Sequence, residues 1–388
     1  TGYNADMTRD ELPPPIWVDT VSGLNALAAD LSAQTAIAVD TESNSLHAYR
    51  ERVCLIQFST PTTDYILDPL AFSNLQPLTS IFSNPAIEKI FHAAEYDLIC
   101  MRRDFGWKIS SMFDTMIAAR TLGWKEVGLA SLLEAHFGVR QNKRHQRADW
   151  AERPLTPDQL AYARLDTHYL FLLRQKLAAE LKAKECWAEA CEEFDRMSNV
   201  NGAAAPVAFD PASFWRVSGA RDLAPRQAAL LRELFIYRED VARRIDRPPF
   251  KVMSEGTLLA LAYAAPHTLD GLRSIPGMTS GQIQRHGARI LEAVARGRKA
   301  PPQHPPGHER RPDDIVNRYD ALHNWRKQRA KARGVESDVI VPRDVLWEIA
   351  AHPPDSAADF ERMASFGPVR REKYGAEIIE VLKNLVNG

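Results

Sequence analysis

Two stretches in the second half of the chain repeat each other at one constant spacing. Arg238 in FIYREDVARR corresponds to Arg326 in LHNWRKQRAK, and Gly287 in GARILEAV corresponds to Gly375 in GAEIIEVL; both pairs are 88 residues apart. The alternative is chance similarity between amphipathic helices, which the shared offset disfavours. A shared offset at both ends of a unit of ~80 residues therefore indicates a duplicated small helical domain.

Two breaks in the periodic pattern divide the chain. MSNVNGAAAPVAFD is rich in small residues with Gly and Pro, and RKAPPQHPPGHERRP is rich in Pro. Both compositions are typical of linkers. The expected organisation is an α/β domain over 1–200, a linker over 201–212, a helical domain over 213–298, a Pro-rich linker over 299–312 and a second helical domain over 313–388.

The first half alternates between short β-rich runs and helical patterns. TAIAVDTES, RVCLIQFST and DYILDPL are separated by turns suited to an antiparallel meander, and EKIFHA is a further strand pattern. Helical spacing marks EYDLICMRRDF, GLASLLEAHFG and a long amphipathic pattern over 156–184, where Thr156 and Pro157 suit the N-cap and the first helical residue. This order predicts a mixed sheet with helices on its faces.

The composition is that of a water-soluble multidomain protein. The 388 residues are 45% hydrophobic and 26% charged with a formal net charge of −1, so any basic surface must be local. The four cysteines form no CxxC pair, which argues against a zinc site or a disulfide framework and favours a reducing cytoplasm. No apolar stretch approaches the ~18 residues of a membrane span, and no signal peptide is visible. TGYNAD, before Met7, has the character of a vector remnant.

A pair of acids closes the strand pattern AIAVDTES. Asp40 and Glu42 lie two residues apart, so both face the same side of a strand, where they repel unless a positive charge lies between them. Asp97 falls in the first turns of a helix after a strand, and Tyr162 and Asp166 lie one helical turn apart. All three segments begin or follow core elements. We therefore expect the five side chains to converge at one edge of the sheet.

Four carboxylates and a phenol suit phosphodiester hydrolysis by two hard divalent cations. Mg²⁺ or Mn²⁺ prefers carboxylate and water oxygens. Two such ions ~4 Å apart can hold an attacking hydroxide and stabilise the leaving 3′ oxygen. A free tyrosine pKa near 10 makes Tyr162 a poor base, so we expect it to orient the water. The structural alternatives are that Asp97 complements a helix macrodipole and that Tyr162 belongs to the core.

The motifs VDTES, HAAEYD and YARLD resemble the three exonuclease motifs of the DEDD superfamily, and the spacing Y-x-x-x-D marks its tyrosine branch. Position 161 is Ala, where the histidine branch would place its His; His168 lies on another helical face and is not predicted to be the base. The segments LIQFS, FDTMIAARTLG, GLASLLEAHFGV and ADWAERPLTPDQLAYARLDTHYL are similar to ribonuclease D, and the duplicated helical units resemble its HRDC domains.

The resemblance implies a ribonuclease H-like exonuclease domain followed by two all-α HRDC-type domains. It implies a distributive, metal-dependent 3′→5′ exoribonuclease that trims RNA 3′ ends, including tRNA precursors and other small structured RNAs, and releases 5′-mononucleotides. The motif positions carry over as Asp40, Glu42, Asp97 and Asp166 for the metals and Tyr162 for the water. We expect a monomer.

Several further residues are candidates to hold RNA. RQNKRHQR at 140–147 is basic and precedes the catalytic helix, so it is either a mobile lid over the terminal phosphates or a solvated loop. NWRKQRAKARG is either a phosphate-binding run or a solvated face. The alternative for His92 is a buried ring that is satisfied by the backbone. The predicted substrate contacts are Ser43, Asn44, Gln57, His92, Lys143 and Trp150.

Two other functions compete with this one. A DNA exonuclease would share the metal chemistry, but the rest of the chain carries no polymerase or helicase motif. A silent RNA-binding scaffold would be expected to lose a carboxylate or the tyrosine, and all five are present.

Overall fold

The computed structural model describes residues 12–141, 143–199, 209–307 and 311–386. These residues form two compact units. One unit combines the chain up to Ser43 with Val53–Ala205 and Arg310–Gly388, and the other combines Asn44–Arg52 with Pro206–Glu309. The TGYNAD segment and most of the predicted 201–212 linker lie outside the described residues. The predicted boundaries between three domains therefore stay predictions.

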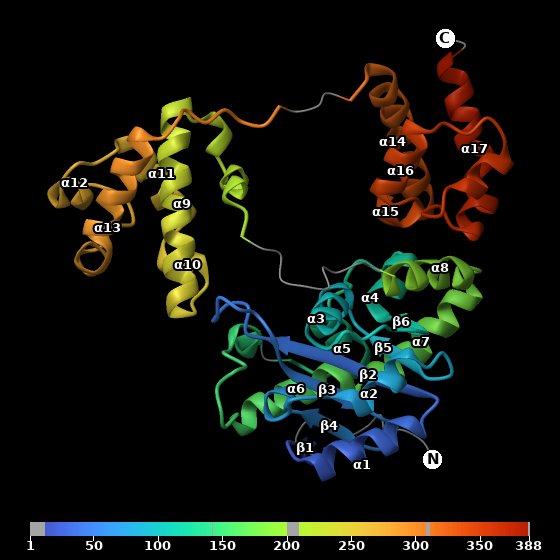
Figure 1. Cartoon of the computed structure of the whole chain (residues 1–388). Coiled ribbons are helices and arrows are strands. Elements are labelled where there is room, and N and C mark those ends of the chain that lie inside the picture. Colours follow the sequence, from blue (N-terminus) through green and yellow to red (C-terminus); the bar gives the residue numbers. More distant parts are fainter. Residues whose placement is uncertain (1–11, 142, 200–208, 308–310, 387–388) are drawn as a thin grey trace. The chain divides into compact units, whose positions relative to one another are not determined.

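A six-stranded mixed sheet forms the centre of the first unit, as predicted (Figure 1). Its strand order is β1-β4-β3-β2-β5-β6; β2, β3 and β4 pair antiparallel, whereas the pairs β1/β4, β2/β5 and β5/β6 are parallel. The three-residue strands β1 and β6 are too short to show a sequence pattern and were not predicted. The strands are β1 (Ile16–Val18), β2 (Ala36–Ser43), β3 (Val53–Ser59), β4 (Asp64–Leu67), β5 (Glu88–Phe91) and β6 (Met112–Asp114).

Helices cover the sheet and bury a continuous apolar core against it. The α-helices of this region are α1 (Val21–Ser32), α2 (Gln76–Ser83), α3 (Glu95–Phe105), α4 (Thr115–Thr121), α5 (Leu129–Phe137), α6 (Pro157–His168), α7 (Leu170–Ala183) and α8 (Trp187–Ser198). Two short 3₁₀ turns, η1 (Pro69–Ala71) and η2 (Lys143–Arg147), lie between them.

The start of α6 is fixed by a capping box. The Thr156 side chain accepts the Gln159 backbone N–H, and the Gln159 side chain accepts the Thr156 N–H at 2.9 Å, which confirms the predicted N-cap. The long pattern over 156–184 is divided at Tyr169 into α6 and α7. The division is needed because α6 packs on β2, β3 and β4, whereas α7 packs on β5 and α4. Tyr169 is buried and its ring stacks on Phe137 at 5.6 Å.

The helical second half confirms the duplication in detail. Arg238 and Arg326 are both buried, and each donates from Nη1 to a backbone carbonyl: Met253 O at 3.3 Å and Val341 O at 2.9 Å, which are again 88 residues apart. The first repeat contains η3 (Pro211–Arg216), η4 (Ala220–Asp222), α9 (Pro225–Ile245), α10 (Pro249–Val252), α11 (Glu255–Ala264), α12 (Leu269–Arg273) and α13 (Ser280–Lys299). The second contains α14 (Asp313–Arg333), α15 (Ser337–Ile340), α16 (Arg343–Ala351), η5 (Ala357–Arg362) and α17 (Pro368–Val386).

Within the first unit, ion pairs hold the second repeat against α8. Glu189 is 2% exposed and accepts Arg333 Nη1 at 2.5 Å and Lys373 Nζ at 2.9 Å. Glu192 accepts Arg370 Nη1 at 2.8 Å, and Arg370 is itself 4% exposed. These helices are therefore part of the same compact body as the sheet. None of the helices described has the length and apolar character that crossing a membrane requires.

Candidate active site

Asp40 and Glu42 lie on the same face at the end of β2, as the alternation of a strand requires. β2 pairs with β3 so that Asp40 lies opposite Gln57 and Glu42 lies opposite Leu55. A register irregularity follows between Glu42 and Ser43. The two acids are thus fixed by a regular ladder up to the point where it is interrupted.

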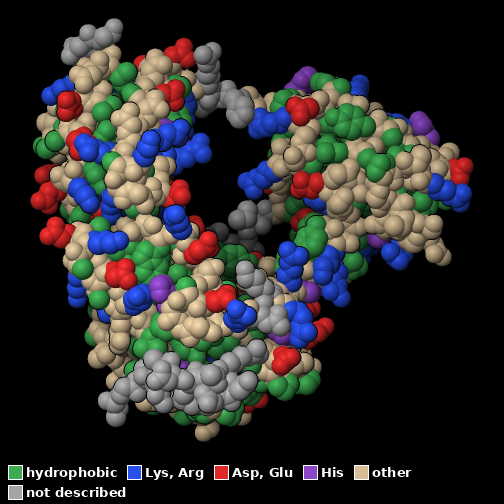
Figure 2. Space-filling model, turned by 180° about the vertical axis from the view of Figure 1, so that it is seen from behind, with side chains coloured by type: hydrophobic (Ala, Val, Ile, Leu, Met, Phe, Trp, Pro, Cys, Tyr) green, Lys and Arg blue, Asp and Glu red, His purple; other side chains and the backbone are tan. Residues whose placement is uncertain are grey.

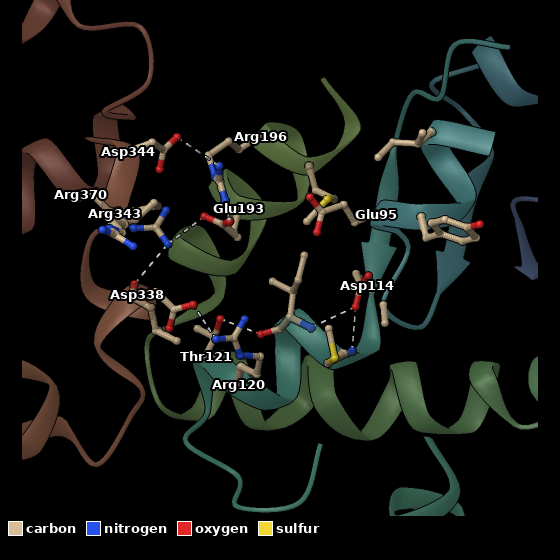
Figure 3. A pocket seen from close by; sticks show the side chains of 18 residues that line it. Glu95, Asp114, Arg120, Thr121, Glu193, Arg196, Asp338, Arg343, Asp344 and Arg370 are labelled. Atoms are coloured by element: carbon tan, nitrogen blue, oxygen red, sulfur yellow. Dashed lines mark hydrogen bonds and ion pairs between the residues drawn. The ribbon is translucent and has the colours of Figure 1, made fainter. Parts of the chain in front are cut away.

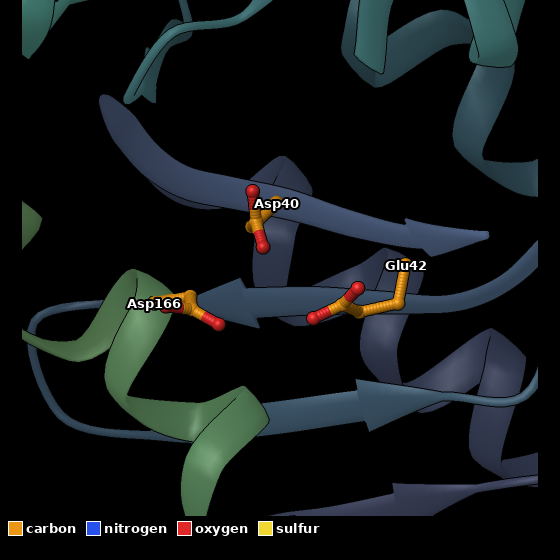
Figure 4. A group of neighbouring side chains, drawn as sticks. All are labelled: Asp40, Glu42 and Asp166. Atoms are coloured by element: carbon orange, nitrogen blue, oxygen red, sulfur yellow. The ribbon is translucent and has the colours of Figure 1, made fainter. Parts of the chain in front are cut away.

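The third acid, Asp166, comes from α6, which covers the same face of the sheet. Ser59 Oγ on β3 donates to Thr167 Oγ1 on α6 at 2.8 Å, which holds the helix against the strands. The carboxylates of Asp40, Glu42 and Asp166 point toward a common space (Figure 4), and one oxygen from each lies within 4.8 Å of the others. Three carboxylates at this separation can hold a metal ion.

Asp97 is the third residue of α3, the helix that follows β5. Thr41 Oγ1, between the two acids of β2, donates a hydrogen bond to Asp97 Oδ1. Asp97 is not one of the three carboxylates within 4.8 Å, but its charge is the largest charge effect on the pKa of Asp40. The fourth acid thus borders the group of three.

The pKa values of all four acids are raised, chiefly because the carboxyls are buried. Burial, followed by repulsion from Asp97 and Asp166, raises the pKa of Asp40 well above its usual value. Burial and repulsion from the same two acids raise the pKa of Glu42 well above its usual value. Burial raises the pKa of both Asp97 and Asp166 to about 7. Bound divalent cations would reverse these shifts, because they supply the missing positive charge.

Tyr162 is one turn before Asp166 and is 6% exposed. Its ring packs against Trp150 with ring centroids 6.0 Å apart and against His145 at 5.8 Å. Burial is the main cause that raises the pKa of the Tyr162 phenol, and Asp166 and Glu42 add to it. The phenol is therefore protonated and can donate a hydrogen bond.

The segment before α6 contacts these catalytic candidates through amides, which the sequence analysis did not single out. Gln141 Nε2 donates to Asp166 Oδ1, and the Gln146 side chain hydrogen-bonds to Tyr162. The predicted phosphate-binding lid rested only on the cations of this segment. Two of those cations form ion pairs with exposed acids, Arg140 with Glu134 at 2.8 Å and Arg144 with Asp158 at 3.4 Å. The Lys143 side chain and Asn142 lie outside the described residues.

The remaining predicted contacts differ in exposure. Ser43 ends β2 and is half-buried. Asn44 is 3% exposed, and its Oδ1 accepts the Arg52 N–H at 2.9 Å, so it orders the loop after β2. His92 follows β5 and shares a hydrogen bond of 2.9 Å between Nδ1 and Thr115 Oγ1. The ring of His92 thus has a side-chain hydroxyl as its partner, and not the backbone partner that the alternative expected.

Two predicted contacts, Gln57 and Trp150, are fully buried, with exposures of 0% and 1%. Neither can touch a nucleotide in this conformation. Trp150 instead packs behind Tyr162. Trp150 Nε1 and both polar atoms of the Gln57 amide have no hydrogen-bond partner.

A cavity of about 620 Å³ lies away from this carboxylate group, between α3, α4, α8 and the second helical repeat (Figure 3). Ion pairs cross its walls, such as Arg120 with Asp338 at 2.6 Å and Arg196 with Asp344 at 3.8 Å. Its lining arginines are Arg120, Arg196, Arg343 and Arg370, and its lining acids are Glu95, Asp114, Glu193, Asp338 and Asp344. Because five acids face four arginines, this cavity offers phosphate no net attraction.

The cationic run on α14 is only partly available to RNA. Arg326 is buried and holds Val341 O, Arg329 pairs with Glu377 at 2.5 Å, and Arg333 pairs with Glu189. On the face drawn in Figure 2, Lys and Arg side chains are interspersed with Asp and Glu. Neither alternative for this run, phosphate binding or a solvated face, holds for Arg326 and Arg333, whose guanidinium groups bind the protein itself.

Both the α/β part of the chain and its two helical repeats match known protein families. Residues 15–182 match the family described as 3′-5′ exonuclease, and residues 227–294 and 316–382 each match the HRDC domain. The ribonuclease D of Acidiphilium cryptum is 30% identical over 363 residues, which cover 91% of this chain and 87% of that relative. The chain belongs to the ribonuclease D family.

Solved structures agree with this assignment. The Escherichia coli RNase D, described as an exoribonuclease involved in structured RNA processing, matches with a TM-score of 0.68 and 26% identity, covering 96% of this chain and 99% of that one. The exosome complex exonuclease RRP6 of Saccharomyces cerevisiae is 33% identical over 310 residues, but the chain spans only 42% of that relative. This ribonuclease D family member is thus a hydrolase of the 3′→5′ exoribonuclease type.

Proposed function

We propose that this ribonuclease D family member trims the 3′ ends of tRNA precursors and other small structured RNAs and releases 5′-mononucleotides. The observation that carries the proposal is the convergence of Asp40, Glu42 and Asp166 within 4.8 Å, bordered by Asp97. A site of buried acids repels RNA phosphate by itself, so the chemistry requires cations between the protein and the substrate.

The residues fit two divalent cations, Mg²⁺ or Mn²⁺. The four candidate ligands offer carboxylate oxygens only, and hard cations prefer such a set. Asp40, Glu42, Asp97 and Asp166 would hold the ions. When bound, two such cations supply the Lewis acidity for in-line hydrolysis of a phosphodiester.

The protein's own groups orient the reactants. Because the Tyr162 phenol is protonated, it acts as a hydrogen-bond donor that orients the attacking water. Trp150 packs against the Tyr162 ring and limits its rotation. Gln141 holds one oxygen of Asp166 from the segment before α6.

Substrate contacts extend from the rim of the site. We assign Ser43, His92 and Lys143 to the terminal nucleotide, since Ser43 ends VDTES, His92 begins HAAEYD and Lys143 lies in the basic segment before α6. Asn44 acts through the loop that it orders. Monomeric state and a cytoplasmic location are part of the proposal, and the four free cysteines suit a reducing compartment.

The test is a time course on matched 5′-labelled single strands of RNA and DNA, each with Mg²⁺, Mn²⁺ or EDTA. An Asp40→Ala/Asp166→Ala variant is the control. The proposal predicts a ladder of 3′-shortened RNA that is absent in EDTA and with the variant. Equal cleavage of DNA would remove the preference for RNA, and no cleavage of either strand would support the silent scaffold.

A further inference from the structure

The Gln57 side chain is a buried amide beneath the carboxylate group. Gln57 is 0% exposed, and both Nε2 and Oε1 lack hydrogen-bond partners. Among the described residues, it is the one side chain for which both polar atoms of an amide are buried without a partner. Unpaired buried amides are rare because they forfeit the hydrogen bonds that they make with water in the unfolded chain.

The position of Gln57 in the sheet places its amide next to Asp40. Gln57 is paired directly with Asp40 across β2 and β3, so the two side chains stand on the same face, with Cβ atoms about 4.5–5.5 Å apart. α6, which carries Asp166, covers that face. The amide therefore lies within a side chain's reach of Asp40, on the side away from solvent.

We propose that Gln57 is a positioning residue for the metal-loaded site: its Nε2–H donates to the Asp40 carboxylate when cations occupy the carboxylate group. A ligating carboxylate gives lone pairs to the metal, and an outer hydrogen bond holds its remaining lone pairs and fixes its orientation. Thr41 already gives Asp97 such a donor, and Gln141 gives one to Asp166. Gln57 completes this pattern for Asp40. The inference rests on the proposed two-cation function and adds to it a residue that does not touch the substrate.

This role predicts opposite effects on the metal-free and the metal-loaded protein. Gln57→Met keeps the length of the side chain but removes both unpaired polar atoms. In EDTA the variant should melt at the wild-type temperature or about 2–4 °C above it. The reason is that the folded protein no longer bears the desolvation free energy of an unpaired buried amide. Its affinity for Mn²⁺ should fall about 10- to 100-fold, as expected for loss of an outer partner of a ligand.

A matched control is available at Gln34. Its amide Nε2 donates a hydrogen bond to Asp30 Oδ1 at 2.8 Å. Gln34 lies in the connection before β2, outside the carboxylate group. Gln34→Met removes a satisfied amide, so it should lower the melting temperature in EDTA and leave Mn²⁺ affinity unchanged. Gln57→Leu provides a second apolar shape in case Met does not fit the site.

The experiment measures melting in EDTA and Mn²⁺ binding by electron paramagnetic resonance for the full chain and these variants. Weaker Mn²⁺ binding in both Gln57 variants, with no loss of metal-free stability in Gln57→Met, supports the inference. Wild-type Mn²⁺ affinity in the Gln57 variants, or a drop in metal-free stability like that of Gln34→Met, overturns it. If the wild-type protein bound no Mn²⁺ and cleaved no RNA, the proposed function itself would fail, which is a distinguishable result.

Discussion

A carboxylate oxygen of Asp40 on β2 lies within 4.8 Å of one from Asp166 on α6. The two residues belong to distant segments, and the Asp166 charge adds to the effect of burial in raising the pKa of both Asp40 and Glu42. Such an arrangement costs folding free energy in the absence of a cation. Cations bound between the carboxylates, as proposed above, would offset this cost.

Asp166→Asn should abolish most of the RNA hydrolysis while keeping the fold. The substitution removes a charged ligand but preserves an oxygen that can accept from Gln141. We expect the rate to fall by more than about 100-fold, which is the largest loss usual for mutation of a residue that only hydrogen-bonds to a metal ligand. Single-turnover assays in saturating Mn²⁺ measure the loss. The matched control is Asp158→Asn on the same helix, an exposed carboxylate that should leave the rate unchanged; equal rates for the two variants would contradict the account.

The metal-free protein should lose stability as pH rises from about 4 to about 7. Asp97 and Asp166 have folded pKa values of about 7, above the value near 3.9 of an unfolded Asp, so the folded state keeps protons that the unfolded chain releases in this window. Their contribution to the free energy of unfolding is full below pH 4 and is lost above pH 7.

Urea unfolding in EDTA at a series of pH values measures this slope. Asp97→Asn should make the slope smaller, because its amide oxygen still accepts from Thr41 but no longer titrates. A slope identical in both proteins would show that Asp97 does not carry the raised pKa.

Tyr162→Phe should lower the rate without changing metal affinity. The phenol is a donor next to the acids and not a metal ligand, so its loss should cost about 100-fold in rate, the scale for one positioned donor. Because its pKa is raised by burial and by Asp166, the fold-loss should be the same at pH 7 and pH 9. Tyr169→Phe, in the turn after α6, is the control and should retain activity. A loss confined to pH above 8 would instead indicate that the phenolate is the active form.

Glu189→Gln should destabilise the first unit. Glu189 is 2% exposed and pairs with Arg333, whose side chain is 18% exposed, and with the more exposed Lys373, so its neutral isostere removes the charge partner of a largely buried guanidinium group. The expected cost is about 3–5 kcal/mol in the free energy of unfolding. Glu134→Gln breaks the exposed pair with Arg140 and should cost less than about 1 kcal/mol. Equal costs in the two variants would show that the junction is not held by these charges.

Periodicity accounts for what could be predicted from the sequence. The period of two in β2 places Asp40 and Glu42 on one face, and the period of 3.6 in α6 places Tyr162 beside Asp166. The spacing of the helical repeat likewise anticipates that Arg238 and Arg326 have equivalent partners. These features depend on residues close together in the sequence, or on the duplication of such a segment.

What could not be predicted depends on partners distant in sequence. The charge of Arg333 is visible in the sequence, but its partner Glu189 becomes known only once α14 packs near α8. The same applies to Gln141, whose amide carries no charge signal and yet holds Asp166. The burial of Gln57 follows from α6 covering β3, which no pattern in LIQFS reveals.

The central claim is that the acids of β2, α3 and α6 bind catalytic cations. Crystals soaked in Mn²⁺ and measured at a wavelength where manganese scatters anomalously test it directly. The account predicts two anomalous peaks among Asp40, Glu42, Asp97 and Asp166 in the wild-type protein, and loss of at least one in Asp166→Asn. No peak at these carboxylates under conditions that support RNA cleavage would contradict it.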